Sequence, residues 1–170
     1  MAVALASSLA ATAAHGDEIV YEYRSDDLNA LMFDPGELIN GVANFEYERA
    51  LNELVGITAG LNINSYRSAW YPNAPGYVAL GPELGIRFHF IRAAPRGLWF
   101  GPYLDLAYVA SRDNGNSATA FGYGVGGAVG YNFTFFRHFL LSLGVGGGFS
   151  DYGYGIRGDP RFRLGIGAVF

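Results

Sequence analysis

The feature that most constrains the fold of this chain is an alternation of apolar residues with glycine or polar residues, which recurs with a period of two. In the closing segment RFRLGIGAVF, Phe162 and every second residue after it are apolar, whereas arginine and glycine occupy most positions between them. The same period marks six further segments: residues 39–49, 53–64, 78–90, 98–108, 120–133 and 139–150. Side chains of a β-strand point alternately to its two faces, so the pattern predicts strands that each have one apolar face.

The composition of the two faces predicts which of them meets an apolar environment. The apolar positions include no charged residue before Arg49, which lies at a segment end. The opposite positions combine ionisable groups with runs of glycine, and the chain has 25 glycines in 170 residues. Interior glycine weakens a strand, so this face would make a poor exterior in water. The sequence therefore predicts an all-β, antiparallel up-and-down transmembrane barrel, with apolar side chains toward lipid and polar ones toward the axis.

Composition excludes several other classes of protein. The chain is 51% hydrophobic and 15% charged, yet no apolar run reaches the roughly 20 residues of a membrane-spanning helix. A net charge of −4 argues against nucleic-acid binding, and the absence of cysteine excludes disulfides and cysteine metal sites. Residues 1–16 are mostly small and apolar and contain an A-x-A-like site. They predict a secretory leader ahead of a barrel over residues 17–170.

The connections between segments predict the number and direction of the strands. Short connections alternate with mostly longer ones that are rich in turn residues: 51–53, 91–97 and 134–138 against 65–76, 111–118 and 150–160. Outer-membrane barrels have short periplasmic turns and longer outer loops, so the segment at 39–49 should run inward. It then needs an outward-running partner before it. Residues 28–37 are the best candidate for this first strand, with a turn at 34–36. Residues 18–25 are an alternative first strand. In either case the sequence predicts about eight strands.

Aromatic residues and two prolines add further expectations. Aromatic rings on the apolar face gather towards segment ends, as the girdles of membrane barrels do at the two water interfaces. Pro82 and Pro102 each remove a backbone donor within a strand, so we expect a local bulge at each.

The chain resembles the small outer-membrane β-barrel proteins of the OmpA and OmpX type. It is most similar to a family of bacterial outer-membrane barrel domains with a YER-(A/L)-L strand end, a Gly-Pro opening to a central strand and a terminal barrel strand. These motifs lie at residues 47–51, 101–104 and 163–170, and the resemblance covers about residues 28–170. The closing segment also resembles the C-terminal signal read by the barrel-assembly machinery, whose positions are here Arg163, Gly165, Ala168 and Phe170. The resemblance implies a bacterial outer-membrane location.

The polar face supplies a candidate functional site in the lumen. Seven charged residues are expected to face the axis: Glu46, Glu48, Glu83, Arg87, Asp105, Arg161 and Arg163. The interior of an eight-stranded barrel is just wide enough for side chains to fill it. Glycine on the segments at 54–64, 120–132 and 142–148 leaves space there for arginine and glutamate from the other strands. We expect carboxylates and guanidinium groups to pair and to plug the lumen, with a structural or interaction role.

Several other functions are possible from the sequence. A narrow pore for small solutes is one alternative. Surface binding or adhesion through an outer loop is another, with Tyr66, Trp70 and Tyr71 as candidate contacts. No histidine neighbours a serine in a nucleophile–base arrangement, so we expect no enzyme, cofactor or metal site. A soluble ligand-binding barrel would need the apolar face inside. Expected partners are outer-membrane lipid, lipopolysaccharide and the assembly machinery, and we expect a monomer.

Overall fold

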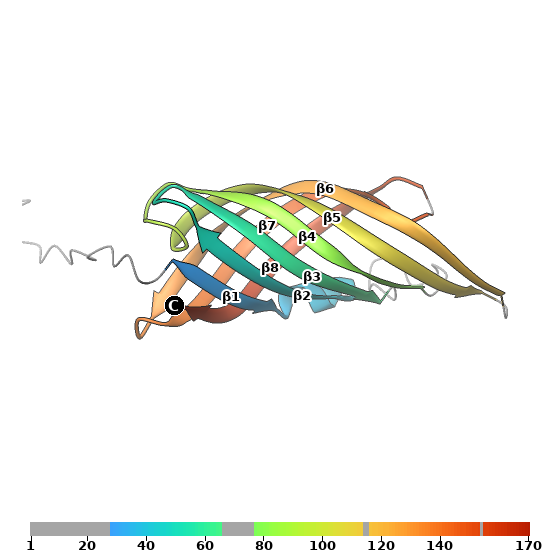
Figure 1. The fold of residues 1–170 in the computed structure, drawn as a ribbon, viewed down its shortest axis with the longest axis horizontal. Helices are drawn as coiled ribbons and strands as arrows, with labels where there is room; N and C mark the ends of the chain where they lie inside the picture. The colour runs from blue at the N-terminus through green and yellow to red at the C-terminus, as the bar shows by residue number, and fades with distance from the viewer. Residues whose placement is uncertain (1–27, 66–76, 114–115, 154) are drawn as a thin grey trace, which may run out of the picture.

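The computed structural model describes residues 28–65, 77–113, 116–153 and 155–170, and the statements below concern that part of the chain. Nearly all of it is β-strand (Figure 1). The elements are β1 (Asn29–Asp34), the 3-10 helix η2 (Gly36–Asn40), β2 (Val42–Ala50), β3 (Val55–Ser65), β4 (Tyr77–His89), β5 (Gly97–Asp113), β6 (Asn116–Phe135), β7 (Phe139–Asp151) and β8 (Arg157–Val169). Several predictions lie outside the described residues: the leader at 1–16, the alternative strand at 18–25, and Tyr66, Trp70 and Tyr71.

The eight strands form one closed antiparallel barrel in which each strand pairs with its neighbours in the sequence (Figure 1). β1 and β8 complete the closure, with Ala30 opposite Val169 and Phe33 opposite Ile166. Closure leaves the sheet without free edges along its paired length. The predicted up-and-down barrel of eight strands is confirmed, as is the first strand within residues 28–37. No helix in the described ranges is long and apolar enough to cross a membrane.

The alternation in the sequence corresponds to the two sides of the barrel wall. On β4, Glu83 and Arg87 are each 3% exposed, whereas Leu84 and Ile86 are 51% and 43% exposed. On the other strands too, large apolar side chains cover the outside and most charged ones are buried inside, although Met32, Trp99 and Leu140 also face inward. This is the reverse of the arrangement in a soluble protein. The predicted assignment of the two faces is confirmed.

The connection between β1 and β2 differs from the prediction. The sequence pattern predicts strand from residue 39, but β2 begins three residues later and η2 precedes it. Pro35 leads into η2 with φ −72°, and Gly41 ends it with φ 79°, a left-handed conformation that suits glycine. These two residues fold the connection into the barrel, where the Glu37 side chain is 3% exposed.

The bulges predicted at Pro82 and Pro102 are absent, and that prediction was wrong. The same register holds before and after each proline, as the flanking β4–β5 partners show: Leu80 with Tyr108, Glu83 with Asp105, Gly85 with Tyr103 and Phe88 with Phe100. A bulge would have shifted this register by one residue. Each proline follows a glycine, Gly81 or Gly101, at which a carbonyl of the neighbouring strand approaches too closely for a Cβ. The β4–β5 partners are missing beside each proline, at residues 81–82 and 101–102, and the pairing resumes in the same register without an inserted residue.

The β5–β6 hairpin is longer than predicted and extends beyond its neighbours (Figure 1). Most residues of the connection expected at 111–118 belong instead to β5 and β6, and the last pair of these two strands is Asp113 opposite Asn116. The connection expected at 150–160 is shortened in the same way, because β7 continues to Asp151. We call the end of the barrel with the connections at 51–54, 90–96 and 136–138 the turn end, and the opposite end the loop end.

Candidate functional site

The lumen holds two clusters of charged side chains. The Arg87 cluster consists of Glu46, Glu48, Arg87, His89 and Arg163. The Arg161 cluster consists of Glu37, Glu83, Asp105 and Arg161, with the neutral Asn62 and Tyr152. All seven charged residues predicted to face the axis do so, and each is 9% exposed or less. The structure thus divides the predicted residues between two adjoining groups.

The Arg87 cluster joins β2, β4 and β8 through alternating charges. Arg87 Nη2 lies 2.7 Å from Glu46 Oε1, and its Nη1 lies 2.6 Å from Glu48 Oε2. Both glutamates are on one face of β2 because they are two residues apart. Arg163 Nη2 approaches Glu46 Oε1 at 2.7 Å, and His89 Nε2 lies 2.8 Å from Glu48 Oε1. Each buried charge therefore has an opposite partner, which offsets the cost of its removal from water.

The β4–β5 connection closes the turn end next to this cluster. Pro95 is almost completely buried, and its carbonyl oxygen accepts a hydrogen bond of 2.6 Å from Asn132 Nδ2. Asn132 Oδ1 in turn accepts from Trp99 Nε1 at 2.9 Å. His89 Nδ1 lies 2.9 Å from the carbonyl oxygen of Arg96. His89 was absent from the residues predicted for the lumen site, although its two-residue spacing from Arg87 was the available signal.

Arg161 lies at the centre of the second cluster, because it contacts two of its carboxylates. Its guanidinium group binds Glu37 of η2, and its Nη2 lies 2.5 Å from Glu83 Oε2. Burial raises the pKa of the Glu37 carboxyl group above its ordinary value, while the neighbouring guanidinium opposes that effect. Glu37 was absent from the predicted set. It belongs to a connection, where no alternation indicates the direction of a side chain.

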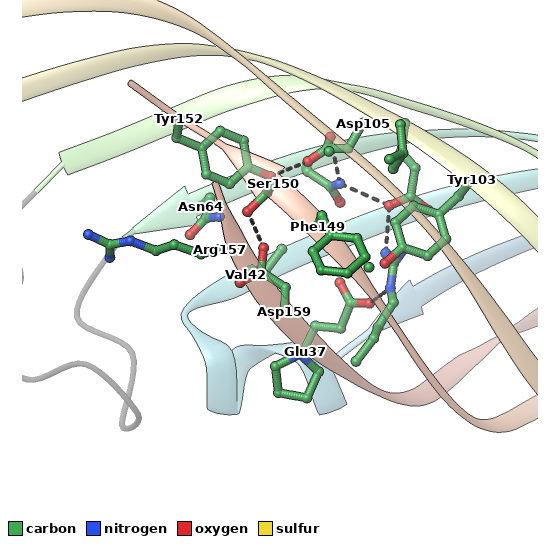
Figure 2. A pocket seen from close by; sticks show the side chains of 17 residues that line it. Glu37, Val42, Asn64, Tyr103, Asp105, Phe149, Ser150, Tyr152, Arg157 and Asp159 are labelled. Carbon is green, nitrogen blue, oxygen red and sulfur yellow. Dashed lines mark hydrogen bonds and ion pairs between the residues drawn. The ribbon is translucent and has the colours of Figure 1, made fainter. Parts of the chain in front are cut away.

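Asp105 differs from the carboxylates that bind Arg87 or Arg161 because its hydrogen-bond partners are neutral. Its Oδ1 accepts from Asn62 Nδ2 at 3.1 Å, and its Oδ2 accepts from the Tyr152 hydroxyl at 2.5 Å (Figure 2). The same Asn62 nitrogen donates to Glu83 Oε2 at 3.0 Å, which links Asp105 to the arginine indirectly. Hydrogen bonds, rather than a direct ion pair, hold this carboxylate in place.

Glycines on β6 and β7 make room for two aromatic rings of β5. A Cβ on Gly130 would lie 2.6 Å from the Trp99 ring, and one on Gly126 would overlap the Tyr103 ring. Guanidinium groups lie over both rings, Arg87 at 4.2 Å from the centroid of Trp99 and Arg161 at 4.3 Å from that of Tyr103. The expectation that arginine and glutamate fill the space beside glycine holds at Gly56 of β3, where a Cβ would meet the Glu48 side chain. On β6 it is corrected: the rings fill the space, and the arginines stack on the rings.

Two small cavities adjoin the charged clusters in the lumen. A cavity of about 120 Å³ lies at the loop end, lined by residues that include Asp105 and Tyr152 (Figure 2). A second cavity of about 20 Å³ lies between the two clusters. Glu83, Tyr103 and Arg161 line both cavities and lie between them. Within the described ranges, no group of three or more histidine or acidic residues is arranged to hold a metal ion.

The predicted assembly-signal residues lie on β8 and directly after it. Arg163 and Gly165 face the lumen, whereas Ala168 and Phe170 lie on the outer surface. The backbone of Phe170 exchanges two hydrogen bonds of 2.9 Å with Asn29, which extends the β1–β8 pairing. Only Arg163 of these four residues belongs to a lumen cluster.

Comparison with known proteins identifies the fold. No family model and no curated protein matches the sequence. Among solved structures, the Neisserial surface protein A (NspA) is similar, with a TM-score of 0.58 and 13% identity over 84% of this chain and 93% of that one. The Yersinia pestis outer-membrane protein Ail, determined in a phospholipid bilayer nanodisc, has a TM-score of 0.50 and 11% identity over 84% and 98%. This chain therefore has the fold of the small outer-membrane barrels.

Proposed function

We propose that this protein is an integral β-barrel of a bacterial outer membrane whose lumen is closed by its own side chains. The apolar exterior is the observation that supports a membrane location. Every strand exposes large apolar residues on it, such as Leu31, Leu84 and Phe162. Such a surface is stable against lipid hydrocarbon and is unstable in water. The fold shared with NspA and Ail supports this location. Short connections at the turn end support a periplasmic position for that end, because outer-membrane barrels have their short turns there.

The contacts within the lumen support a closed interior. The Arg87 cluster, the Trp99 ring and the buried Pro95 of the β4–β5 connection occupy the turn-end half of the barrel. Opening a path would separate paired charges in a medium of low dielectric constant, which is costly. We therefore propose a structural or interaction role rather than transport, with the narrow pore as the alternative.

Other elements of this proposal rest on the sequence. Surface binding through Tyr66, Trp70 and Tyr71 stays a prediction, as do contact with lipopolysaccharide and a monomeric state. We propose no catalytic role, because His89 and His138 in the described ranges contact a carboxylate and backbone carbonyl groups rather than a serine hydroxyl.

Fractionation of cells that produce the protein tests its location and assembly. We expect it in the outer-membrane fraction, resistant to carbonate and salt and released only by detergent. Removal of Phe170 should lower the amount of folded barrel, because it deletes the last residue of the proposed assembly signal and the pairing with Asn29. Phe139→Ala, at a similarly exposed aromatic within the chain, is the control. Release of the wild type by carbonate would refute the membrane location.

Planar-bilayer recording tests the closed lumen. The reconstituted wild type should show no steady open channel at moderate voltage, because Glu83, Tyr103 and Arg161 separate the two cavities. Folded protein must be verified in the same sample by its heat-modifiable migration on a gel. A steady conductance of uniform size would contradict the plug and favour the pore.

A further inference from the structure

The β6–β7 connection holds an aromatic and a basic residue in an unfavourable backbone conformation at the turn end. Phe136 and Arg137 have φ angles of 50° and 72°, in the left-handed region that non-glycine residues rarely adopt. Phe136 is 94% exposed, so burial of its ring within the protein offers no compensation. Glycine or asparagine would form such a turn at lower cost. The identity of these two side chains therefore points to a function outside the barrel itself.

The β6–β7 connection lies at the end of a row of aromatic rings on the outer surface of β6 and β7. Ring centroids are 4.5 Å apart for Tyr131 and Phe133, and 6.3 Å apart both for Phe133 and Phe135 and for Phe135 and Phe139. The last three of these side chains are 39–44% exposed. Aromatic rings favour the boundary between hydrocarbon and headgroups. This row therefore places the connection at the level of the lipid headgroups.

The turn end as a whole combines exposed apolar side chains with positive charge. The three connections contain Arg92, Arg96 and Arg137 against a single acidic residue, Glu53. They also expose large apolar residues by 60% or more: Leu51, Leu54, Phe90, Ile91 and Phe136. Such a surface is complementary to a layer of anionic headgroups over hydrocarbon and is poorly suited to bulk water.

We propose that Phe136 and Arg137 form a binding element for the headgroup of an anionic phospholipid in the periplasmic leaflet. The Phe136 ring enters the upper acyl region, and the Arg137 guanidinium donates hydrogen bonds to the phosphate. This proposal rests on the proposed function, which places the turn end at that leaflet. Lipopolysaccharide would lie at the loop end, so the occupant is a phospholipid. Lipid contact then compensates the backbone conformation of the turn.

Tryptophan quenching by brominated lipids tests the proposal. Phe136→Trp keeps an aromatic anchor and reports the lipid next to it, with the wild type, which contains Trp70 and Trp99, as background. In vesicles that mix phosphatidylcholine with either brominated phosphatidylcholine or brominated phosphatidylglycerol, we expect about fivefold preference for the anionic lipid. That factor corresponds to the roughly 1 kcal/mol that one arginine contributes near an anionic surface.

Adding Arg137→Gln to this reporter should remove the preference, whereas Arg157→Gln, at the loop end, should leave it unchanged. High salt should reduce the preference of the reporter in the same way as the Arg137 substitution. The headgroup site would be overturned if the preference for anionic lipid were equal with and without Arg137. It would also be overturned if no brominated lipid quenched the introduced tryptophan. Neither result would contradict the proposed insertion of the barrel. Protein that fails to insert at all would overturn the proposed membrane location together with this site.

Discussion

Gly130→Ala is expected to destabilise the barrel by about 1–3 kcal/mol, although it adds only a methyl group. The added Cβ would lie 2.5 Å from the carbonyl oxygen of Leu143 and 2.6 Å from the Trp99 ring. Neither neighbour moves easily, because the carbonyl belongs to a paired strand and Trp99 is held by Asn132 at 2.9 Å. Alanine in a strand otherwise has the advantage over glycine of a smaller entropy loss on folding. A loss of stability would therefore report the packing of the lumen.

Gly127→Ala is the matched control on the same strand. Gly127 faces outward, and a Cβ there would meet nothing nearer than 3.7 Å. We expect this variant to be as stable as the wild type or slightly more stable. Urea unfolding in lipid vesicles, followed by loss of heat-modifiable migration, measures both variants. Equal stability of the two alanine variants would show that glycines on β6 are not needed to make room for the aromatic rings.

Residues within strands were predictable because a single rule, the period of two, determines their direction. It placed Arg87 in the lumen and Leu84 outside before any partner was known, and the charged strand residues of the two clusters follow from it. The rule holds wherever a strand is paired on both sides. It therefore identified the barrel, the direction of its faces and most of the lumen chemistry from the sequence alone.

Residues whose positions depend on connections or on strand register were not predictable in this way. Glu37 reaches Arg161 only because Pro35 and Gly41 turn η2 inward, and no periodicity describes such a segment. The contact of Gly130 with Trp99 depends on how far β5 is shifted along β6, which the composition of neither strand specifies. The period of two puts Trp99 and Gly130 on the lumen face of their strands, but which ring meets which glycine depends on the register.

Arg87→Gln is expected to have the largest effect, a loss of about 3–5 kcal/mol in the free energy of unfolding. Arg87 contacts both Glu46 and Glu48 at 2.6–2.7 Å, and all three side chains are almost fully buried. Glutamine keeps much of the volume but removes the positive charge, so the two carboxylates lose their shared partner. Urea unfolding in lipid vesicles measures the loss. Arg49→Gln, at an exposed position of β2, should cost less than about 1 kcal/mol by the same measurement.

The double variant Arg87→Gln, Glu48→Gln separates loss of charge balance from loss of packing. Removing one carboxylate relieves part of the unpaired negative charge, so the double variant should be more stable than Arg87→Gln alone. His89 Nε2, 2.8 Å from the Glu48 oxygen in the wild type, can still donate to the new amide oxygen. If the second substitution instead adds its own loss, steric fit around Arg87 rather than electrostatic pairing would hold the lumen closed. This distinction identifies what keeps the lumen closed. If charge pairs hold it closed, the barrel loses stability when one charge of a pair is removed and regains part of it when the opposite charge is removed as well.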